Sequence, residues 1–421
     1  MTPFFRKTCR SLIVSTVFVA SHLMSPVRAW SFDQTIPAAC PIPRSTDIAA
    51  ITITASHAEY GQYGRADTWY PSWAADGNCY SPFMDGTVDG MTACGYNGHP
   101  ALGFACIVGD DPLKLVVAKS TLIHETIDPA AGFTARYGCT VLSYKNTFYF
   151  GSSYRYMSGQ DWHYLRPFAG FDISTDHGKT WTKRSGALFP EGEYPNIKIG
   201  EPHFVDFGRE MEHSPDGKAY LVAFGAKSEL AATRPRQPPM KKVDALENPH
   251  WCWGDCIYLL RLTSSPETIN DPSKYEFYAG SGADGKPAWT KDFSKIKPVV
   301  EWPDNMGQVA VTYIPALKKF VMCVTDGHSY NKSYNSYFLE SNDLTGPWRI
   351  MTYWKAFGEQ AYFVNIPSKF VGATVENGAV TAWIAYSANF CSGMKSDPPG
   401  SGYAMCLRQI LIHAMPSTKG P

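Results

Sequence analysis

Charged residues are scarce in this chain. Asp, Glu, Lys and Arg make up 18% of its 421 residues, and 38 basic side chains balance 38 acidic ones. A nucleic-acid-binding protein usually carries a basic excess or patch, and this composition indicates neither. Helical periodicity is also nearly absent, because short β-branched and aromatic runs alternate with Gly, Pro, Asn and Asp clusters. We therefore expect an all-β protein that does not bind nucleic acid.

Several common catalytic motifs are missing as well. The sequence contains no G-x-S-x-G, no H-E-x-x-H and no P-loop. A Gly-Asp-Asp sequence at 109–111 offers carboxylates for a structural calcium ion, but it lacks EF-hand spacing and is typical of a turn. We expect no cofactor and no catalytic metal.

The one long apolar run lies at the N-terminus. Arg6, Lys7 and Arg10 precede a mostly apolar segment at 11–24, and Val-Arg-Ala follows at 27–29. This order is typical of a secretory signal peptide whose apolar part is too short to span a membrane. We expect cleavage after residue 29 and secretion of residues 30–421 as a soluble monomer without a membrane anchor.

Cysteine usage fits the same compartment. The chain has 11 cysteines, and Cys9 lies in the predicted leader. An even number in the exported part favours disulfides, up to five of them, over metal thiolates. Cys252 and Cys256 are spaced to close a local loop, whereas a zinc site would need a second pair that is missing.

Hairpins of similar layout recur five times along the exported chain. Their predicted turns lie at 76–77, 145–146, 215–217, 317–318 and 377–378, and further strand-like segments fill the gaps. Each unit is typical of a four-stranded antiparallel blade, so we predict one five-bladed β-propeller domain over 30–421. The strand at 406–414 should complete a blade with the N-terminal segment. A two-domain β-sandwich is the alternative, but no linker divides the chain into halves.

Two motifs mark turns between strands. "STDHGKTW" at 174–181 has the S-x-D-x-G-x-T-W pattern of an Asp box, and "SNDLTGPW" at 341–348 occupies the equivalent place in the fourth unit. Because the aspartate of such a motif serves the turn, Asp176 and Asp343 are poor catalytic candidates.

The first hairpin carries an aspartate at each open end. A turn at 76–77 places Asp67 opposite Asp85, within one position, and directly opposed residues have Cβ atoms about 4.5–5.5 Å apart. Two carboxylates this close raise the pKa of one of them and suit acid/base or nucleophilic chemistry on glycosides. The alternative is that one aspartate caps a turn while the other faces water.

A third carboxylate begins the third hairpin. Glu201 should face the channel across from the first unit, as a general acid or as a buried partner of Arg155 or Arg209. The same turn arithmetic places Arg136 opposite Arg155 and Gln308 near His328. The residues that we expect to contact substrate are Trp69, Tyr70, Trp73, Arg136, Arg155, His203, Gln308 and His328.

Three segments resemble a family of bacterial and fungal propellers long catalogued as a domain of unknown function. They are "ADTWYPSWAADGNCYSPFMDG", "GEPHFVDFGREMEHSPDGKAYLVAFGA" and "SNDLTGPW", and the resemblance covers roughly 60–415. Some members of that family are endo-D-arabinofuranosidases that cut arabinan. The resemblance implies a propeller glycoside hydrolase whose aspartate pair maps onto Asp67 and Asp85.

The sequence thus predicts a secreted glycoside hydrolase acting on a polysaccharide or oligosaccharide. One of Asp67 and Asp85 would be the base or nucleophile, and the other, or Glu201, the acid. Chemistry by Asp67 and Glu201 across the channel would suit inversion, and chemistry by the facing aspartates would suit retention. The alternatives are a non-catalytic carbohydrate-binding propeller and a polysaccharide lyase that uses Arg136, Arg155 and His203.

Overall fold

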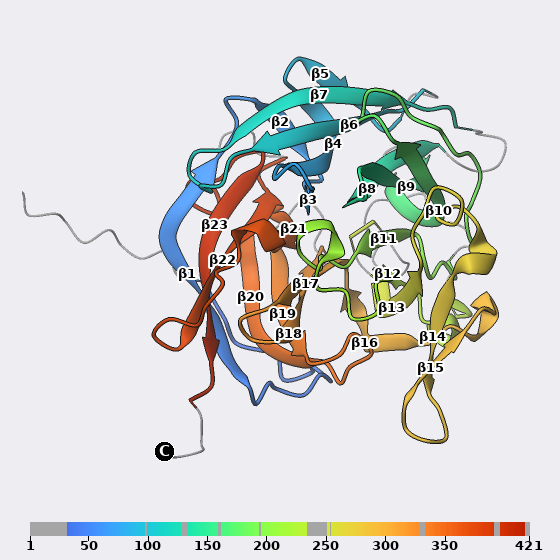
Figure 1. The fold of residues 1–421 in the computed structure, drawn as a ribbon. Helices are drawn as coiled ribbons and strands as arrows, with labels where there is room; N and C mark the ends of the chain where they lie inside the picture. The colour runs from blue at the N-terminus through green and yellow to red at the C-terminus, as the bar shows by residue number, and fades with distance from the viewer. Residues whose placement is uncertain are drawn as a thin grey trace, which may run out of the picture. The chain divides into compact units, whose positions relative to one another are not determined.

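Five antiparallel sheets are arranged as the blades of a propeller (Figure 1). The computed structural model describes residues 32–96, 99–127, 134–158, 161–192, 195–233, 251–252, 254–327, 333–390 and 396–416. Residues Phe32–Pro421 form one compact unit. The predicted all-β, five-bladed propeller is confirmed, and the sandwich alternative is wrong.

The first blade contains β2 (Gly64–Asp67), β4 (Cys79–Val88), β6 (Ala101–Val108) and β7 (Val116–His124), with the short β3 (Ser72–Trp73) and β5 (Met91–Ala93) beside β4. The second contains β8 (Ala135–Tyr144), β9 (Thr147–Ser158) and β10 (Asp161–Ser174). The third contains β11 (Glu201–Phe204), β12 (Ala219–Gly225), β13 (Gly254–Leu262), β14 (Glu276–Ser281) and β15 (Pro287–Thr290), with β16 (Pro298–Met306) beside β13.

The fourth blade contains β17 (Gln308–Ile314), β18 (Lys319–Asp326), β19 (Ser333–Ser341) and β20 (Arg349–Glu359). The fifth contains β21 (Tyr362–Asn365), β22 (Ala379–Ser387), β23 (Cys406–Ala414) and β1 (Ile48–Glu59). Helix is limited, within the described residues, to α1 (Ser228–Ala231) and to 3-10 turns at Arg209–Met211, Pro272–Lys274, Phe293–Lys295 and Ser368–Phe370. The fourth and fifth blades have four strands each, and the first has a path of four with two short strands beside it. The second blade has three strands and the third has six.

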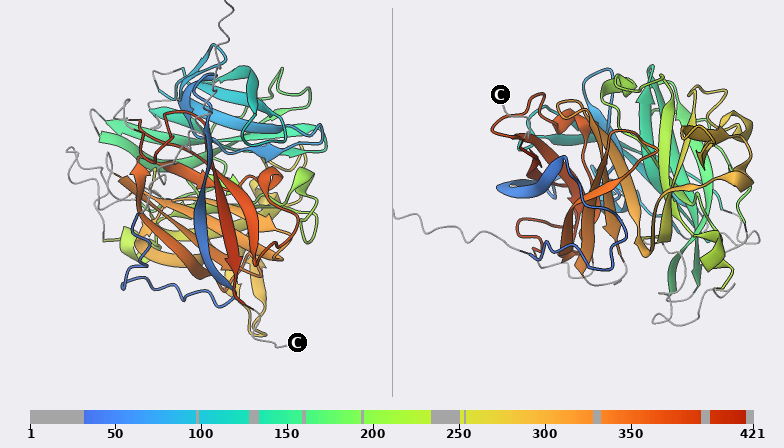
Figure 2. Two further views of the ribbon diagram at one scale, coloured as in Figure 1. Left: turned by 90° about the vertical axis from the view of Figure 1, so that its left-hand side faces the viewer. Right: turned by 90° about the horizontal axis from the view of Figure 1, so that it is seen from below.

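The ring closes where the two ends of the described chain meet. β1 pairs with β23 in antiparallel register, with Ile51 opposite Ile412, and the two strands lie side by side in Figures 1 and 2. This is the predicted completion of the last blade by the N-terminal segment. Closure leaves β21 as the inner strand of the fifth blade, next to β17 of the fourth.

The hairpin turns follow from local backbone chemistry. Lys145 and Asn146 have φ of 52° and 58°, and Asn377 and Gly378 have φ of 51° and 77°. Two successive positive φ values match the right-handed twist of the paired strands, and Asn and Gly tolerate them best. Two of the turns predicted from sequence therefore lie where expected.

The Asp-box segment is held by its own side chains. Asp176 accepts hydrogen bonds from the amides of Lys179 and Thr180 and from the Thr180 hydroxyl, which hold its pKa down at about 2. Asp343 accepts from the amide and hydroxyl of Thr345 in the same way. Both aspartates serve turns and lie away from the cavities described below.

The disulfide framework expected from the cysteine count is not formed in the described part of the chain. All nine cysteines there, which exclude Cys9 and Cys391, are free, and seven are buried. Cys252 lies near Gly327, where its thiol contacts a backbone oxygen at 3.5 Å, and it does not pair with Cys256. A buried thiol packs as a small apolar group, so the buried cysteines serve as core residues.

The Gly-Asp-Asp segment is a turn fixed by a lysine. Lys369 donates to the Gly109 carbonyl at 2.6 Å and pairs with Asp110 at 2.9 Å. Nowhere in the described ranges do three or more His, Cys, Asp or Glu side chains gather as metal ligands would. Likewise, none of the helices described is long and apolar enough to cross a membrane.

Ring closure predicts a specific stability pattern within β1. Ile51 is fully buried, whereas Ile53 on the same strand is half-buried. We expect Ile51→Ala to destabilise the fold by about 2–5 kcal/mol and Ile53→Ala by clearly less, because only the first leaves a cavity in a closed interface. Urea unfolding of both variants measures this, and equal losses would contradict a tightly packed closure.

Candidate active site

A cavity opens at the end of the propeller axis where several inner strands begin. It is lined by three carboxylates, Asp67, Asp85 and Glu201, and by Arg155. These residues come from the first, second and third blades, and the fifth blade adds Tyr362 and Phe363. The structure therefore brings together four of the five predicted site residues that are aspartate, glutamate or arginine, all except Arg136.

A β-bulge aims Asp85 into this cavity. Arg65 pairs with Thr87 and Asp67 with Met84, so Asp85 and Gly86 together oppose one residue of β2. Asp85 has φ of +50°, a left-handed conformation that aspartate tolerates better than most residues. A Cβ on Gly86 would lie 1.8 Å from the Arg65 carbonyl oxygen, so only glycine permits this approach. Bulges commonly re-aim a side chain beside an active site.

Asp67 is buried among hydroxyl groups. It accepts hydrogen bonds from the hydroxyls of Thr68 at 2.8 Å, Tyr362 at 3.0 Å and Tyr403 at 2.9 Å. Burial raises the pKa of Asp67 to about 6, and these three hydroxyls oppose the rise because they stabilise the ionised form. The charge of nearby Glu201 raises the pKa further.

Asp85 has a poorer environment for charge. Its Oδ1 is buried without a hydrogen-bond partner. Burial raises the pKa of Asp85 to about 8, and the neighbouring Asp67 charge raises it further, while Tyr137 and the Gly95 amide lower it. At neutral pH Asp85 is therefore the protonated member of the pair.

Glu201 is locked in an ion pair at the start of β11. Arg155 and the Gln308 side-chain amide both donate to its Oε2. Burial raises its pKa, opposed by the charge and hydrogen bond of Arg155. Protonating Glu201 would leave a buried arginine without its counter-charge, which is costly. Of the two interpretations of Glu201 that the sequence left open, its contacts are those of a buried partner of Arg155.

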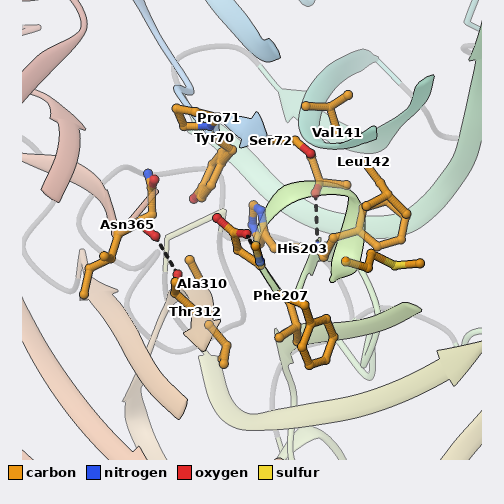
Figure 3. A pocket seen from close by; sticks show the side chains of 18 residues that line it. Tyr70, Pro71, Ser72, Val141, Leu142, His203, Phe207, Ala310, Thr312 and Asn365 are labelled. Carbon is orange, nitrogen blue, oxygen red and sulfur yellow. Dashed lines mark hydrogen bonds between the residues drawn. The ribbon is translucent and has the colours of Figure 1, made fainter. Parts of the chain in front are cut away.

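His203 and Tyr70 separate this cavity from a second one in the central channel. Their rings lie 4.2 Å apart, and His203 Nε2 bonds Gln308 Oε1 at 2.8 Å. Both line the channel cavity together with Ala310 and Thr312 of β17 and Asn365 of β21 (Figure 3). Burial lowers the pKa of His203 to about 4, so it is neutral at pH 7.

Three predicted substrate-binding residues, Trp69, Trp73 and Arg136, lie outside the two axial cavities. Trp69 is 2% exposed and stacks on Phe83 in the core of the first blade. Trp73 packs against the same core. Both lie outside the two axial cavities, because they come before the turn of the hairpin and face inward between sheets.

Arg136 is also displaced from the channel. A bulge at Cys139 shifts the register of β8 by one, so Ala135, and not Arg136, lies opposite Arg155. The Arg136 side chain instead points into the second blade, where it pairs with Glu125 at 2.7 Å and Asp172 at 3.3 Å. A one-residue slip moves a side chain to the other face of a strand.

The fourth hairpin turns about one residue earlier than predicted. Its register places Thr325, not His328, opposite Gln308. His328 lies outside the described residues, so its predicted role is not tested here. Gln308 itself is buried and contacts Glu201 and His203, as its predicted place at the channel mouth suggests.

Sequence reasoning missed the tyrosines around the aspartate pair. Tyr137 comes from the second blade, and Tyr362 and Tyr403 from the fifth. The Tyr403 hydroxyl reaches both Asp67 Oδ2 at 2.9 Å and the backbone carbonyl of Asp85 at 3.0 Å, so it links the carboxyl group of one aspartate to the backbone of the other. The 24 tyrosines of the chain are the only hint in the sequence, and nothing there distinguishes these three.

The comparisons with known proteins concern the fold. No family model matches this sequence, and no curated protein matches it. Similar solved structures include a GH43_1 enzyme from Xanthomonas citri (11% identity, TM-score 0.43, covering 85% of this chain and 90% of that one). Others are a family 117 glycoside hydrolase from Zobellia galactanivorans (10%, 0.45, 87% and 91%) and a GH43 beta-xylosidase/alpha-arabinofuranosidase from a compost metagenome (12%, 0.43, 88% and 97%).

At such identities the likeness concerns the fold alone. The family resemblance drawn from the three sequence motifs stays a prediction.

The burial of Asp85 predicts a pH-dependent cost in stability. Its pKa of about 8 in the fold exceeds its ordinary value of 3.8, so the native state loses stability as pH rises from about 4 through 8. We expect Asp85→Asn to raise the unfolding temperature relative to the natural protein, by an amount that grows between pH 5 and pH 9.

Asp76→Asn is the matched control, because hydrogen bonds in the turn lower the pKa of Asp76. Scanning calorimetry at both pH values measures the difference. A gain for Asp85→Asn that does not depend on pH would contradict a buried, charge-averse carboxyl at this position.

Proposed function

We propose that this protein is a glycoside hydrolase in which Asp85 is the general acid and Asp67 the nucleophile or base. The observation that carries the proposal is a pair of carboxylates in one cavity whose environments push their pKa values apart. Paired acids with separated pKa values are how one site holds a proton donor and a negative charge at the same pH. Glycosidic bond cleavage needs that combination.

Asp85 suits the acid role better than Glu201. A proton on Asp85 relieves a buried, unpartnered oxygen, whereas a proton on Glu201 would break its pairing with Arg155. A general acid must also release its proton in the transition state and regain it afterwards. Glu201 and Arg155 then act as a fixed, nearly neutral pair that shapes the wall of the cavity.

Asp67 suits the charged role because three hydroxyls point at it. Tyr403 has one proton for two acceptors, Asp67 Oδ2 and the Asp85 carbonyl oxygen. Ionised Asp67 attracts that proton, so the hydrogen bond strengthens as charge develops there. The anomer of the first product, followed by NMR, distinguishes direct attack by Asp67 from activation of a water.

The walls of the cavity suit a sugar ring. Trp251, Tyr362, Phe363 and Phe390 all line it, and Phe390 is 37% exposed at the rim. Aromatic faces bind the apolar faces of sugars, and the carboxylates and hydroxyls remain for the polar edges. Arabinan is the first substrate to test because of the motif resemblance, and the predicted leader would place the enzyme outside the cell with such polymers.

The two alternatives receive less support. A binding module would gain nothing from two close buried carboxylates, because their burial and mutual repulsion cost stability. A lyase would need a base and free arginines for a uronate, yet Arg155 is neutralised by Glu201, and Arg136 lies inside the second blade. Burial also raises the pKa of Tyr137 and Tyr362 well above the ordinary value, so neither is a ready base.

The first test is turnover on a panel of arabinan, arabinoxylan, xylan, arabinogalactan and the matching 4-nitrophenyl glycosides. We expect hydrolysis of at least one, and a loss of about 10²–10⁴-fold in kcat for Asp67→Asn and for Asp85→Asn. Asp76→Asn, in the turn of the same hairpin, should keep the natural rate. Turnover that survives both substitutions would refute the assignment, and binding without turnover would favour a binding module.

The second test is the pH profile. We expect kcat/KM to rise as Asp67 ionises near pH 6 and to fall as Asp85 loses its proton near pH 8, with both limbs belonging to the coupled pair. Tyr362→Phe removes a donor to ionised Asp67, so the acidic limb should move to higher pH. Tyr313→Phe, remote from the cavity, is the control, and an acidic limb that stays in place would contradict this role for Tyr362.

A further inference from the structure

Another hollow, distinct from the channel cavity, lies directly beside the cavity that holds the aspartate pair. It is a groove over β2 and the bulge of β4, lined by residues 61–65, 85–87 and Tyr403. Asp85 lines both hollows. The two differ in size, because the groove has an empty volume of about 860 Å³, which includes open solvent, and the cavity one of about 500 Å³.

We propose that this groove binds the sugar on the leaving-group side of the bond that is cut, with Tyr63 and Arg65 as specificity-determining residues. The inference rests on the proposed glycoside hydrolase function. A general acid must reach the oxygen that links two sugars, so it has to stand between their binding places. Asp85 is the member of the pair that lines both hollows, and the roomier one suits the continuing chain.

Tyr403 connects the groove with the aspartate pair. Its hydroxyl bonds Asp67 on the cavity side and the Asp85 carbonyl, while the residue also lines the groove. A ligand seated in the groove therefore contacts the residue that orients the two acids. Occupation of the groove and alignment of the pair are coupled through one side chain.

Two of the glycines that line the groove let β2 and β4 approach closely. Gly64 has φ of +150°, and a Cβ there would lie 2.0 Å from the Thr87 carbonyl oxygen. Gly86 is constrained in the same way by the Arg65 carbonyl oxygen. The two glycines therefore permit the close strand pairing at the bulge that carries Asp85.

Tyr63 and Arg65 provide the groups that would recognise a sugar. The Tyr63 ring is held against Tyr60, with centroids 6.4 Å apart and planes at 24°, so it is ordered before any ligand binds. Arg65 is exposed on β2, and its side chain makes no ion pair or hydrogen bond with the residues that the structure describes. Its guanidinium has five donors for sugar hydroxyls, and the ring supplies an apolar face.

The test compares two kinds of substrate from the panel. A 4-nitrophenyl glycoside has a small activated leaving group that does not need a sugar in the groove, whereas the polysaccharide does. We expect Arg65→Met and Tyr63→Leu each to lower kcat/KM on the polysaccharide about tenfold and to leave the 4-nitrophenyl glycoside within about twofold. Lys286→Met, a change of an exposed cation on a remote hairpin, is the control and should alter neither.

Equal losses on both substrates, or no loss on the polysaccharide, would overturn the assignment of the groove. Hydrogen–deuterium exchange with the same glycans separates this inference from the function on which it rests. Protection of 61–65 by a glycan that is not hydrolysed would support the groove and refute the hydrolase. Turnover without protection of 61–65 would refute the groove alone, and neither turnover nor protection would refute both.

Discussion

The pairing of β1 with β23 is the contact on which the site depends. The ring of a propeller is closed only when its last blade is completed, here by the strand nearest the N-terminus. Closure places the fifth blade beside the first, and only then do Tyr362 and Tyr403 reach Asp67 across about 300 positions of sequence, with separations of 295 and 336. The ionisation of the aspartate pair is thus a property of the closed ring.

Two different solutions to burying a carboxylate occur within one cavity. Glu201 has a positive partner in Arg155 and an amide donor in Gln308, and Asp67 has hydroxyls. Asp85 has only Tyr137 and the Gly95 amide to oppose the effect of burial, and its buried Oδ1 is left without a partner. Perturbed carboxyl groups of this kind are common at functional sites. The contrast separates Asp85 from Asp67 and Glu201, whose charged forms are stabilised by their partners.

Arg136 lies in a separate cluster of buried charges. With Glu125 and Asp172 it forms a buried group of two acids and one base inside the second blade, and burial with mutual repulsion raises the pKa of Glu125 to about 7. Arg136 lies away from both axial cavities, and its guanidinium also donates hydrogen bonds to Ser152 and the Arg184 carbonyl. Perturbed acids here hold a blade together.

The sequence by itself determined the all-β class, the five units, the ring closure and the place of Asp67, Asp85 and Glu201 near one channel mouth. These follow from alternating strand patterns and turn residues, which act over a few positions. Only the tertiary structure decided which side chains face the cavity, because single-residue bulges at Asp85 and Cys139 shift the register beyond them. It alone brought in the tyrosines of distant blades, whose hydroxyl positions no local pattern encodes, and so separated the ionisation of two aspartates that look alike in the sequence.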